Sequence, residues 1–335
     1  MINAAIIGLG WWGHYLLRTL QGTSDKIRIV RAIDYNPKIL KDLEGLASAT
    51  GVILSADMQD AFDDTDVQAV ILTTPHSLHE AQIAQVAQAG KHVFCEKPLG
   101  LTKASAERSV AACQSAGVML GIGHERRFDP ALIEIKRMID AGELGTILHG
   151  EANFSHDSLA GADPDNWRVS KEHAPAAGMT AMGIHLTDSY IHMLGPIDQV
   201  YAQTARRVVQ SETGDVVSAH LRFESGVTAY LNSILATPFF MCTRIFGSDA
   251  WVEARDTVRP EAEGITYLTL CRAGGKPETR KMPSINTAVV NLETFADAIS
   301  GVAAYPFTPE EMVNNIAVLE AITRSVESGE AERVP

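Results

Sequence analysis

The first thirteen residues combine a glycine pattern with flanking elements that would let it bind an anion. An apolar run over residues 2–7 leads directly into Gly8-Leu9-Gly10-Trp11-Trp12-Gly13, and a helical pattern follows. In such a turn the first glycine permits the tight bend, the second lets the backbone approach a pyrophosphate, and the third lets helix pack on strand. The N–H groups at the helix start then face the negative charge. The pattern predicts a dinucleotide site, with candidate binding residues Gly8, Gly10, Trp11, Trp12 and Gly13.

A carboxylate at the end of the second expected strand indicates which dinucleotide binds. Residues 27–33 form an apolar run, and Asp34 closes it 21 residues after Gly13. A carboxylate at that position accepts hydrogen bonds from the adenosine ribose. Because it would also repel the 2′-phosphate of NADP, the sequence favours NAD over NADP. The alternative for Asp34 is a turn or helix-capping role before Asn36-Pro37.

Length, charge and cysteine content narrow the class of protein. At 335 residues the chain exceeds the usual size of a single core, so we expect two domains. A net charge of −13, without a block of lysine or arginine, argues against nucleic acid or an anionic membrane as partner. No apolar run is long enough to span a bilayer, and no signal-peptide pattern is present. The four cysteines lack metal-type spacing, so we expect reduced thiols, a cytoplasmic protein and no metal site.

The first part of the chain alternates between strand and helix patterns. Such alternation is typical of a doubly wound parallel sheet, so residues 1–123 are expected to form an α/β dinucleotide-binding Rossmann domain. The expected strands are residues 2–7, 27–33, 52–54, 67–72, 92–95 and 118–122, and the expected helices are residues 37–50, 79–89 and 102–116.

The second part, residues 124–335, has a different pattern. Helix patterns cover residues 130–141, 288–300 and 309–328, a strand covers 146–153, and hairpins pair 216–223 with 227–235, 243–246 with 251–254, and 265–271 with 279–282. This indicates an α+β domain, with an open, mostly antiparallel sheet and helices on one face. Aromatic and aliphatic residues such as Tyr230, Leu231, Ile234 and Leu235 favour covering of the other face by a second subunit. We therefore assign substrate binding and homo-oligomerisation to this domain.

Glu96-Lys97-Pro98 follows an expected parallel strand, at the edge of the sheet where ligands bind. A lysine there would lie near the nicotinamide, where its charge can orient a hydroxyl and stabilise a developing alkoxide. If desolvated, its pKa falls and it can also carry the proton. The alternative is a solvated Glu–Lys pair in a loop.

Five segments, in the same order over most of the chain, resemble the glucose–fructose oxidoreductase / myo-inositol dehydrogenase (Gfo/Idh/MocA) family of NAD(P)-dependent oxidoreductases. These segments are residues 8–13, 74–79, 90–98, 123–128 and 178–185. The resemblance implies a two-domain subunit with the active site between the domains, assembled into homodimers or homotetramers. It implies that Lys97 is catalytic and that Glu96 helps hold the nicotinamide end of the cofactor. It also implies that Thr74 and His79 belong to the cofactor site and that Arg127 approaches cofactor or substrate.

One position departs from the family pattern. The family commonly has Asp-x-Gly-x-His where this chain has Ala181-Met182-Gly183-Ile184-His185, so the histidine is kept and the carboxylate is absent. On a helix, residues four apart share a face, and the missing group would have raised the pKa of His185. Asp188 is one candidate replacement, with an ordinary polar helix position as the alternative. For His185 itself the alternative is a core histidine.

The combined pattern predicts an NAD-dependent dehydrogenase that oxidises a secondary hydroxyl of a sugar, sugar derivative or polyol. His185 would take the hydroxyl proton while Lys97 stabilises the alkoxide, although either group could be the base. Trp167 and Arg168 could form a substrate wall, a surface ion pair being the alternative for Arg168. Two other functions remain open. One is an NADPH-dependent reductase of a keto-sugar on the same fold, which Asp34 disfavours; the other is a non-catalytic dinucleotide-binding regulator, which the loss of the carboxylate at Ala181 suggests.

Overall fold

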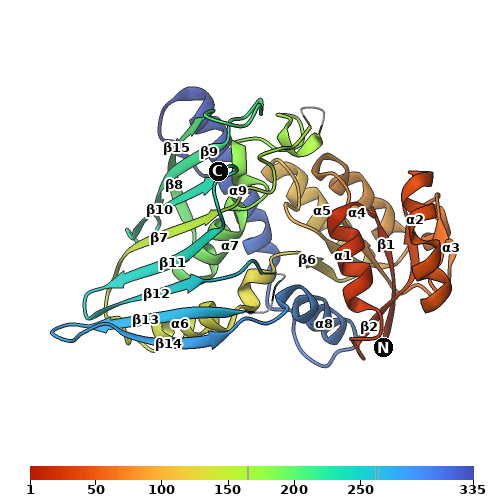
Figure 1. The fold of residues 1–335 in the computed structure, drawn as a ribbon, viewed down its shortest axis with the longest axis horizontal. Coiled ribbons are helices and arrows are strands. Elements are labelled where there is room, and N and C mark those ends of the chain that lie inside the picture. Colours follow the sequence, from red (N-terminus) through yellow and green to blue (C-terminus); the bar gives the residue numbers. More distant parts are fainter. Residues whose placement is uncertain (164–165, 261, 263) are drawn as a thin grey trace. The chain divides into compact units, whose positions relative to one another are not determined.

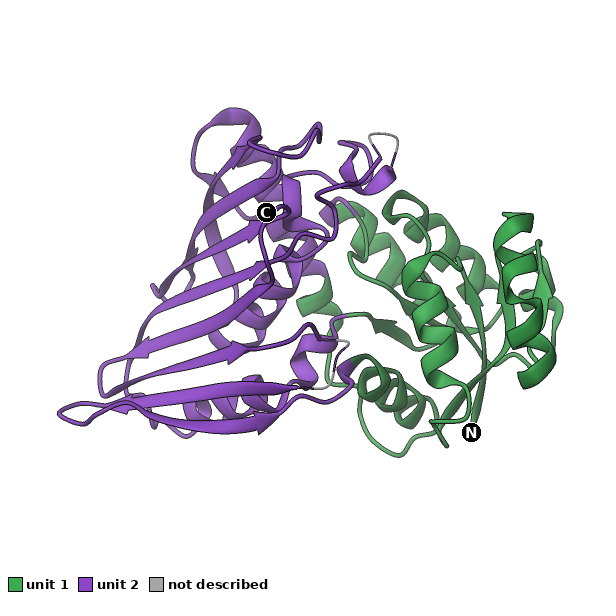
Figure 2. Ribbon diagram, in the orientation of Figure 1, with its two compact units in different colours: residues 1–100, 104–123, 288–312 green, residues 101–103, 124–287, 313–335 purple. Residues whose placement is uncertain are grey.

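The computed structural model describes residues 1–163, 166–260, 262 and 264–335. The chain divides into two compact units, shown in Figure 2. The first holds Met1–Gly100, Ala104–Gly123 and Ala288–Met312, and the second holds Leu101–Lys103, His124–Thr287 and Val313–Pro335. The chain crosses from the first unit to the second after Gly123, the position where the sequence suggested a domain boundary. Residues 288–312, expected in the second domain, instead join the first unit.

The first unit contains a six-stranded parallel sheet with the strand order β3-β2-β1-β4-β5-β6 (Figure 1). Its strands are β1 Ile2–Ile7, β2 Ile27–Ile33, β3 Ile53–Ser55, β4 Ala69–Leu72, β5 His92–Cys95 and β6 Leu120–Ile122. This order confirms the doubly wound fold. Strands β1 to β3 are added toward one edge of the sheet and β4 to β6 toward the other, so the strand order reverses between β1 and β4. Ligands bind such sheets at the carboxyl ends of the strands beside that reversal.

The helices of the first unit bury their apolar faces against this sheet. They are α1 Trp11–Leu20, α2 Pro37–Thr50, α3 Gln59–Asp63, α4 His79–Gln88, α5 Lys103–Ala116 and α8 Thr287–Ile299. Leu16, Leu17 and Leu20 give α1 a fully buried stripe because they recur at helical spacing. Helix α8 belongs to this unit because the Phe295 ring packs edge-on against Phe94 of β5, with ring centroids 5.5 Å apart.

The second unit contains a nine-stranded sheet with the order β14-β13-β12-β11-β7-β10-β9-β8-β15. Neighbouring strands are antiparallel except β7 and β10, which run parallel. This confirms the mostly antiparallel α+β prediction and its three hairpins; β8 was not expected. The strands are β7 Ile147–Ser155, β8 Ile197–Ala205, β9 Val216–Phe223, β10 Thr228–Ile234, β11 Phe240–Gly247, β12 Ala250–Asp256, β13 Ile265–Arg272, β14 Glu278–Pro283 and β15 Glu332–Arg333.

Helices pack on one face of this sheet. They are α6 Pro130–Asp140, α7 Gly183–Leu194 and α9 Pro309–Ser328, with the short helical turns η2 Glu125–Phe128, η3 Trp167–Val169 and η4 Ala177–Met179. Tyr190 anchors α7, because its hydroxyl donates to the Tyr230 carbonyl at 3.0 Å and a Cβ on Gly150 would lie 3.0 Å from its ring. Since α7 begins at Gly183, Ala181 lies before the helix, and the expectation that it shares a helical face with His185 is wrong.

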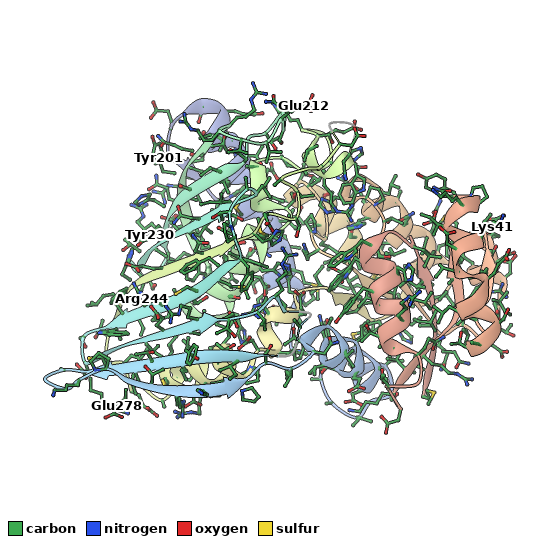
Figure 3. All side chains as sticks on the ribbon, in the orientation of Figure 1. Lys41, Tyr201, Glu212, Tyr230, Arg244 and Glu278 are labelled. Atoms are coloured by element: carbon green, nitrogen blue, oxygen red, sulfur yellow. The ribbon has the colours of Figure 1, made fainter. Side chains whose placement is uncertain are left out.

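The opposite face of the same sheet carries aromatic and charged side chains. Figure 3 labels Tyr201, Tyr230 and Arg244 on this face, from β8, β10 and β11. Strand alternation places Leu231 on the helix-covered side, where it is fully buried, and Leu235 is 1% exposed. These two leucines therefore do not contribute to the open face, contrary to the expectation from sequence.

Candidate active site

The glycine turn has the geometry that its sequence predicts. Gly8 has φ +92°, a left-handed conformation that glycine adopts without strain. A Cβ on Gly13 would lie 2.0 Å from the Gly8 carbonyl oxygen, so only glycine allows α1 to pack there. A Cβ on Gly10 would meet no atom within 4 Å. The turn thus leaves open space at the glycine expected to approach a pyrophosphate, immediately before the first N–H groups of α1.

Asp34 is held rigidly at the end of β2. Its Oδ2 accepts a hydrogen bond from the Leu9 N–H at 2.7 Å, and its Oδ1 accepts one from the Asn36 N–H at 2.9 Å. The residue is 7% exposed. The turn-capping alternative is therefore part of what Asp34 does, since it joins the glycine turn to the start of α2. Each carboxylate oxygen keeps a second lone pair for a ribose hydroxyl.

His79 joins the loops that follow β4 and β5. It is fully buried, with Nδ1 2.7 Å from the Pro98 carbonyl oxygen and Nε2 2.9 Å from that of Thr74. Burial lowers the pKa of this imidazole, the two carbonyls partly offset that effect, and the Lys97 charge lowers the pKa further. His79 therefore sets the positions of the Thr74 and Lys97-Pro98 backbones.

Glu96 and Lys97 follow β5, joined to Pro98 by a cis peptide bond. The Glu96 carboxylate lies against Gly123, where an added Cβ would be 2.5 Å from it. Burial raises the pKa of Glu96 to about 7, although the Lys97 charge, the Trp12 side chain and the Lys97 N–H each lower it. Glu96 can therefore exchange a proton near neutral pH, directly beside the half-buried Lys97.

The two tryptophans of the glycine turn form an aromatic stack with Tyr15. Trp12 lies 5.1 Å from Tyr15 and 5.6 Å from Trp11, measured between ring centroids. Trp11 is 65% exposed, and Trp12 is half-buried. Trp12 is thus part of the stack and also lowers the pKa of Glu96, while Trp11 presents an aromatic face at the start of α1.

In the second unit, Arg127 and Asp188 form a buried, bidentate ion pair. Arg127 Nη2 lies 2.7 Å from Asp188 Oδ1, and Arg127 Nε lies 2.9 Å from Asp188 Oδ2. Their side chains are 3% and 1% exposed. The pair fastens η2 to α7. Asp188 thus uses both of its oxygens on Arg127, which does not support it as the substitute carboxylate for His185.

The carboxylate beside His185 belongs instead to Glu125. Glu125 Oε2 lies 3.8 Å from His185 Nδ1, and the two side chains are 10% and 4% exposed. The His185 ring also packs edge-on against His124, with centroids 5.5 Å apart at 89°, and against Phe154 at 6.1 Å. Sequence reasoning assigned Glu125 no role, although it lies within the matched segment of residues 123–128.

A hydrogen-bond network defines the state of the neighbouring His124. The Asn315 amide nitrogen donates to His124 Nε2 at 3.0 Å and to the Ile184 carbonyl at 3.2 Å, and its oxygen accepts from the Thr187 hydroxyl at 2.6 Å. This network assigns the amide orientation, so His124 Nε2 is an acceptor and the ring is neutral.

Trp167 and Arg168 lie in η3. The Arg168 guanidinium carbon is 4.2 Å from the centroid of the Trp167 ring, a cation–π contact. Burial lowers the pKa of Arg168. A half-buried guanidinium stacked on an indole is a more specific arrangement than a solvated surface ion pair.

Two features are absent from the part of the chain that the structure describes. There, no group of three or more histidine, cysteine, aspartate or glutamate side chains could hold a metal ion. Within the same residues, no helix has the length and apolar character to cross a membrane.

Comparison with known proteins identifies the family. Residues 2–124 match the model of the oxidoreductase family with an NAD-binding Rossmann fold, and residues 132–253 match the GFO/IDH/MocA C-terminal domain. The chain belongs to the Gfo/Idh/MocA family. This confirms the resemblance seen in its motifs and makes the chain an oxidoreductase that uses a nicotinamide dinucleotide.

Three relatives of this Gfo/Idh/MocA protein indicate the range of its neighbours. It is 30% identical over 276 residues to D-xylose 1-dehydrogenase (NADP(+)) 2 of Haloferax volcanii, covering 80% of this chain and 81% of the relative. It is 29% identical to scyllo-inositol 2-dehydrogenase (NAD(+)) of Bacillus subtilis, covering 71% and 68%. The crystal structure of aldose-aldose oxidoreductase from Caulobacter crescentus, complexed with glycerol, matches with a TM-score of 0.87 and 25% identity, covering 99% of both chains.

Proposed function

We propose that this protein is an NAD-dependent dehydrogenase that oxidises a secondary hydroxyl of a sugar, a sugar derivative or a polyol. The observation that carries the proposal is the arrangement around Lys97: His79 Nδ1 lies 2.7 Å from the carbonyl oxygen of the next residue, Pro98, and the preceding Glu96 is buried against Gly123. The named activities of the xylose and inositol dehydrogenases support the substrate class.

Lys97 and His185 are the proposed catalytic residues. Bound NAD would supply the acceptor for the hydride that leaves the substrate carbon. His185 takes the proton of the hydroxyl, and Lys97 stabilises the negative charge that develops on its oxygen. Either group can be the final base, because both a neutral imidazole and a neutral amine accept a proton.

The residues of the first unit fit a dinucleotide. The space at Gly10 and the N–H groups of Trp11, Trp12 and Gly13 suit a pyrophosphate, and Thr74, His79 and Glu96 support the nicotinamide end. Asp34 supports NAD as the partner rather than NADP. Because both of its oxygens already accept backbone hydrogen bonds, the carboxylate cannot swing away from a 2′-phosphate without losing them.

Trp167 and Arg168 are the proposed substrate contacts, because a stacked guanidinium presents planar donors to hydroxyl or carboxylate groups. We assign Arg127 and Asp188 a supporting role. Their charges neutralise each other, and their pairing holds α7, the helix that carries His185.

We also propose that a second copy of this chain covers the open face of the second-unit sheet. That face carries Tyr230 beside His149 and His220, and Arg244 paired with Glu151 and Glu253. Tyrosine and arginine are enriched in subunit interfaces, which supports a partner on this face. Light scattering after size-exclusion chromatography tests this: a monomeric mass at micromolar concentration would contradict it.

The function is tested by screening sugars, inositols and sugar acids for reduction of NAD, followed by absorbance. We expect turnover with at least one secondary alcohol, and Lys97→Ala should abolish that turnover while NAD binding remains. Lys91→Ala is a matched control in the same unit and should retain activity. Full turnover in the Lys97 variant would place the chemistry elsewhere.

A further inference from the structure

The carboxylate that the family pattern provides next to the active-site histidine is missing from its usual position. Ala181 occupies that position, and it lies two residues before α7 begins at Gly183. A neutral methyl group there neither orients an imidazole nor stabilises its charged form. The structure nevertheless places a different carboxylate beside His185.

That carboxylate is Glu125, which comes from a different element. It lies in η2, whereas His185 lies in the first turn of α7. Oε2 is 3.8 Å from Nδ1, which is longer than a hydrogen bond but close enough for direct electrostatic attraction with little intervening solvent. His124 and Phe154 pack on the imidazole and limit its orientation.

The neighbouring charged groups already have partners of their own. Arg126 lies 3.0 Å from both Asp129 and Asp256, and these two act on it more strongly than Glu125 does. Arg127 is paired with Asp188. His124 is neutral in its hydrogen-bond network with Asn315. These contacts accompany the 3.8 Å approach of Glu125 Oε2 to His185 Nδ1, which is the geometric basis for pairing the two side chains.

We propose that Glu125 is the positioning residue for His185, supplying from η2 the carboxylate that the chain lacks at Ala181. The inference rests on the proposed function for the role of His185. Glu125 favours the tautomer with a proton on Nδ1, in which Nε2 is the unprotonated nitrogen that accepts the substrate hydroxyl proton. Once Nε2 is protonated, the same carboxylate stabilises the imidazolium.

The first test needs no catalytic activity. NMR of ¹⁵N-labelled histidine rings measures the pKa of His185, whose signals are assigned by their loss in His185→Asn. Because a nearby negative charge favours imidazolium, we expect Glu125→Gln to lower that pKa by about one unit or more. Glu125→Asp keeps the charge and should give an intermediate value. Glu143→Gln, which removes an exposed carboxylate paired with Arg137, is the matched control and should leave it unchanged.

The second test uses turnover of the full-length enzyme. Glu125→Gln should lower kcat about 10- to 100-fold, a part of the 10²–10⁴ that a positioned base contributes, while the KM for NAD stays unchanged. The acidic limb of the kcat/KM profile should move to lower pH, since the base becomes harder to protonate. A purely structural role would reduce stability without moving that limb.

The two tests separate the inference from the proposed function. An unchanged His185 pKa in a folded variant that lacks the Glu125 charge overturns the inference, whatever the activity. A shifted pKa in a protein that reduces no nicotinamide cofactor with any polyol supports the pairing and overturns the proposed function. If Glu125→Gln does not fold, Glu125→Ala, which also removes the charge, carries the same comparison, with a wild-type pKa as the contradicting result.

Discussion

Asp188 and Arg127 form a two-point ion pair inside the second unit, with N–O distances of 2.7 and 2.9 Å. Both side chains are almost completely buried. The geometry matches that of bidentate guanidinium–carboxylate pairs, which are short and directional. The pair connects η2, which also carries Glu125, to α7, which carries His185.

Replacing Asp188 by Asn should lower the free energy of unfolding by about 3–5 kcal/mol, because the Arg127 charge would remain buried without its partner. Denaturant unfolding measures this. Asp140→Asn is a matched control, since it breaks the exposed Lys136–Asp140 pair and should cost under about 1 kcal/mol. Similar losses in the two variants would contradict a special role for the buried pair.

Two alanine substitutions in the glycine turn should have different effects. Gly10→Ala adds a methyl group to open space, so the fold should persist while NAD affinity falls at least tenfold. Gly13→Ala places a methyl group 2.0 Å from the Gly8 carbonyl oxygen and should destabilise the first unit itself. Thermal unfolding and cofactor titration, measured on both variants, distinguish the two effects. An equal loss of stability in both variants would contradict the different roles assigned to Gly10 and Gly13.

Asp34→Ser should weaken the preference for NAD. The substitution removes the charge that repels a 2′-phosphate and two charge-assisted hydrogen bonds to the backbone. It also removes the proposed acceptor for a ribose hydroxyl, and since a hydrogen bond to a charged group contributes about 1.5–3 kcal/mol, KM for NAD should rise about tenfold or more, while KM for NADP should fall. Asp25→Asn, an exposed carboxylate of the same unit, serves as control. An unchanged NAD/NADP ratio would show that Asp34 does not set cofactor choice.

Glu96 should make stability depend on pH. Its pKa is about 7 in the fold and about 4.5 in the unfolded chain, so between these values the folded protein holds a proton that the unfolded chain loses. The stabilisation is therefore fully present below about pH 4.5 and is lost as pH rises to about 7, by about 3 kcal/mol. The free energy of unfolding is measured with urea between pH 4.5 and 7. Glu96→Gln should remove its dependence on pH, whereas Glu44→Gln, on the exposed side of α2, should keep it.

Local sequence signals were sufficient to predict the strands and the glycine turn of the Rossmann unit. The apolar run at residues 2–7, the glycine turn and the end of β2 at Asp34 each depend on neighbours close in the chain. A buried parallel strand must be apolar throughout, and only glycine adopts the Gly8 conformation without strain. The hairpins of the second unit could be predicted for the same reason, since a short turn determines which strands pair.

The sequence by itself thus indicated the family, through the resemblance of five motif segments. It also predicted the fold class and the glycine turn, because these follow from periodicity and from glycine stereochemistry. Only the tertiary structure decided which carboxylate meets which base. Spacing in the chain made Asp188 one candidate partner of His185, yet packing pairs Asp188 with Arg127 and brings Glu125 to the imidazole from 60 residues away. Burial of Leu231 and the return of α8 to the first unit also depend on long-range packing. Contacts between elements distant in sequence leave no periodic signal, so no local pattern could have predicted them.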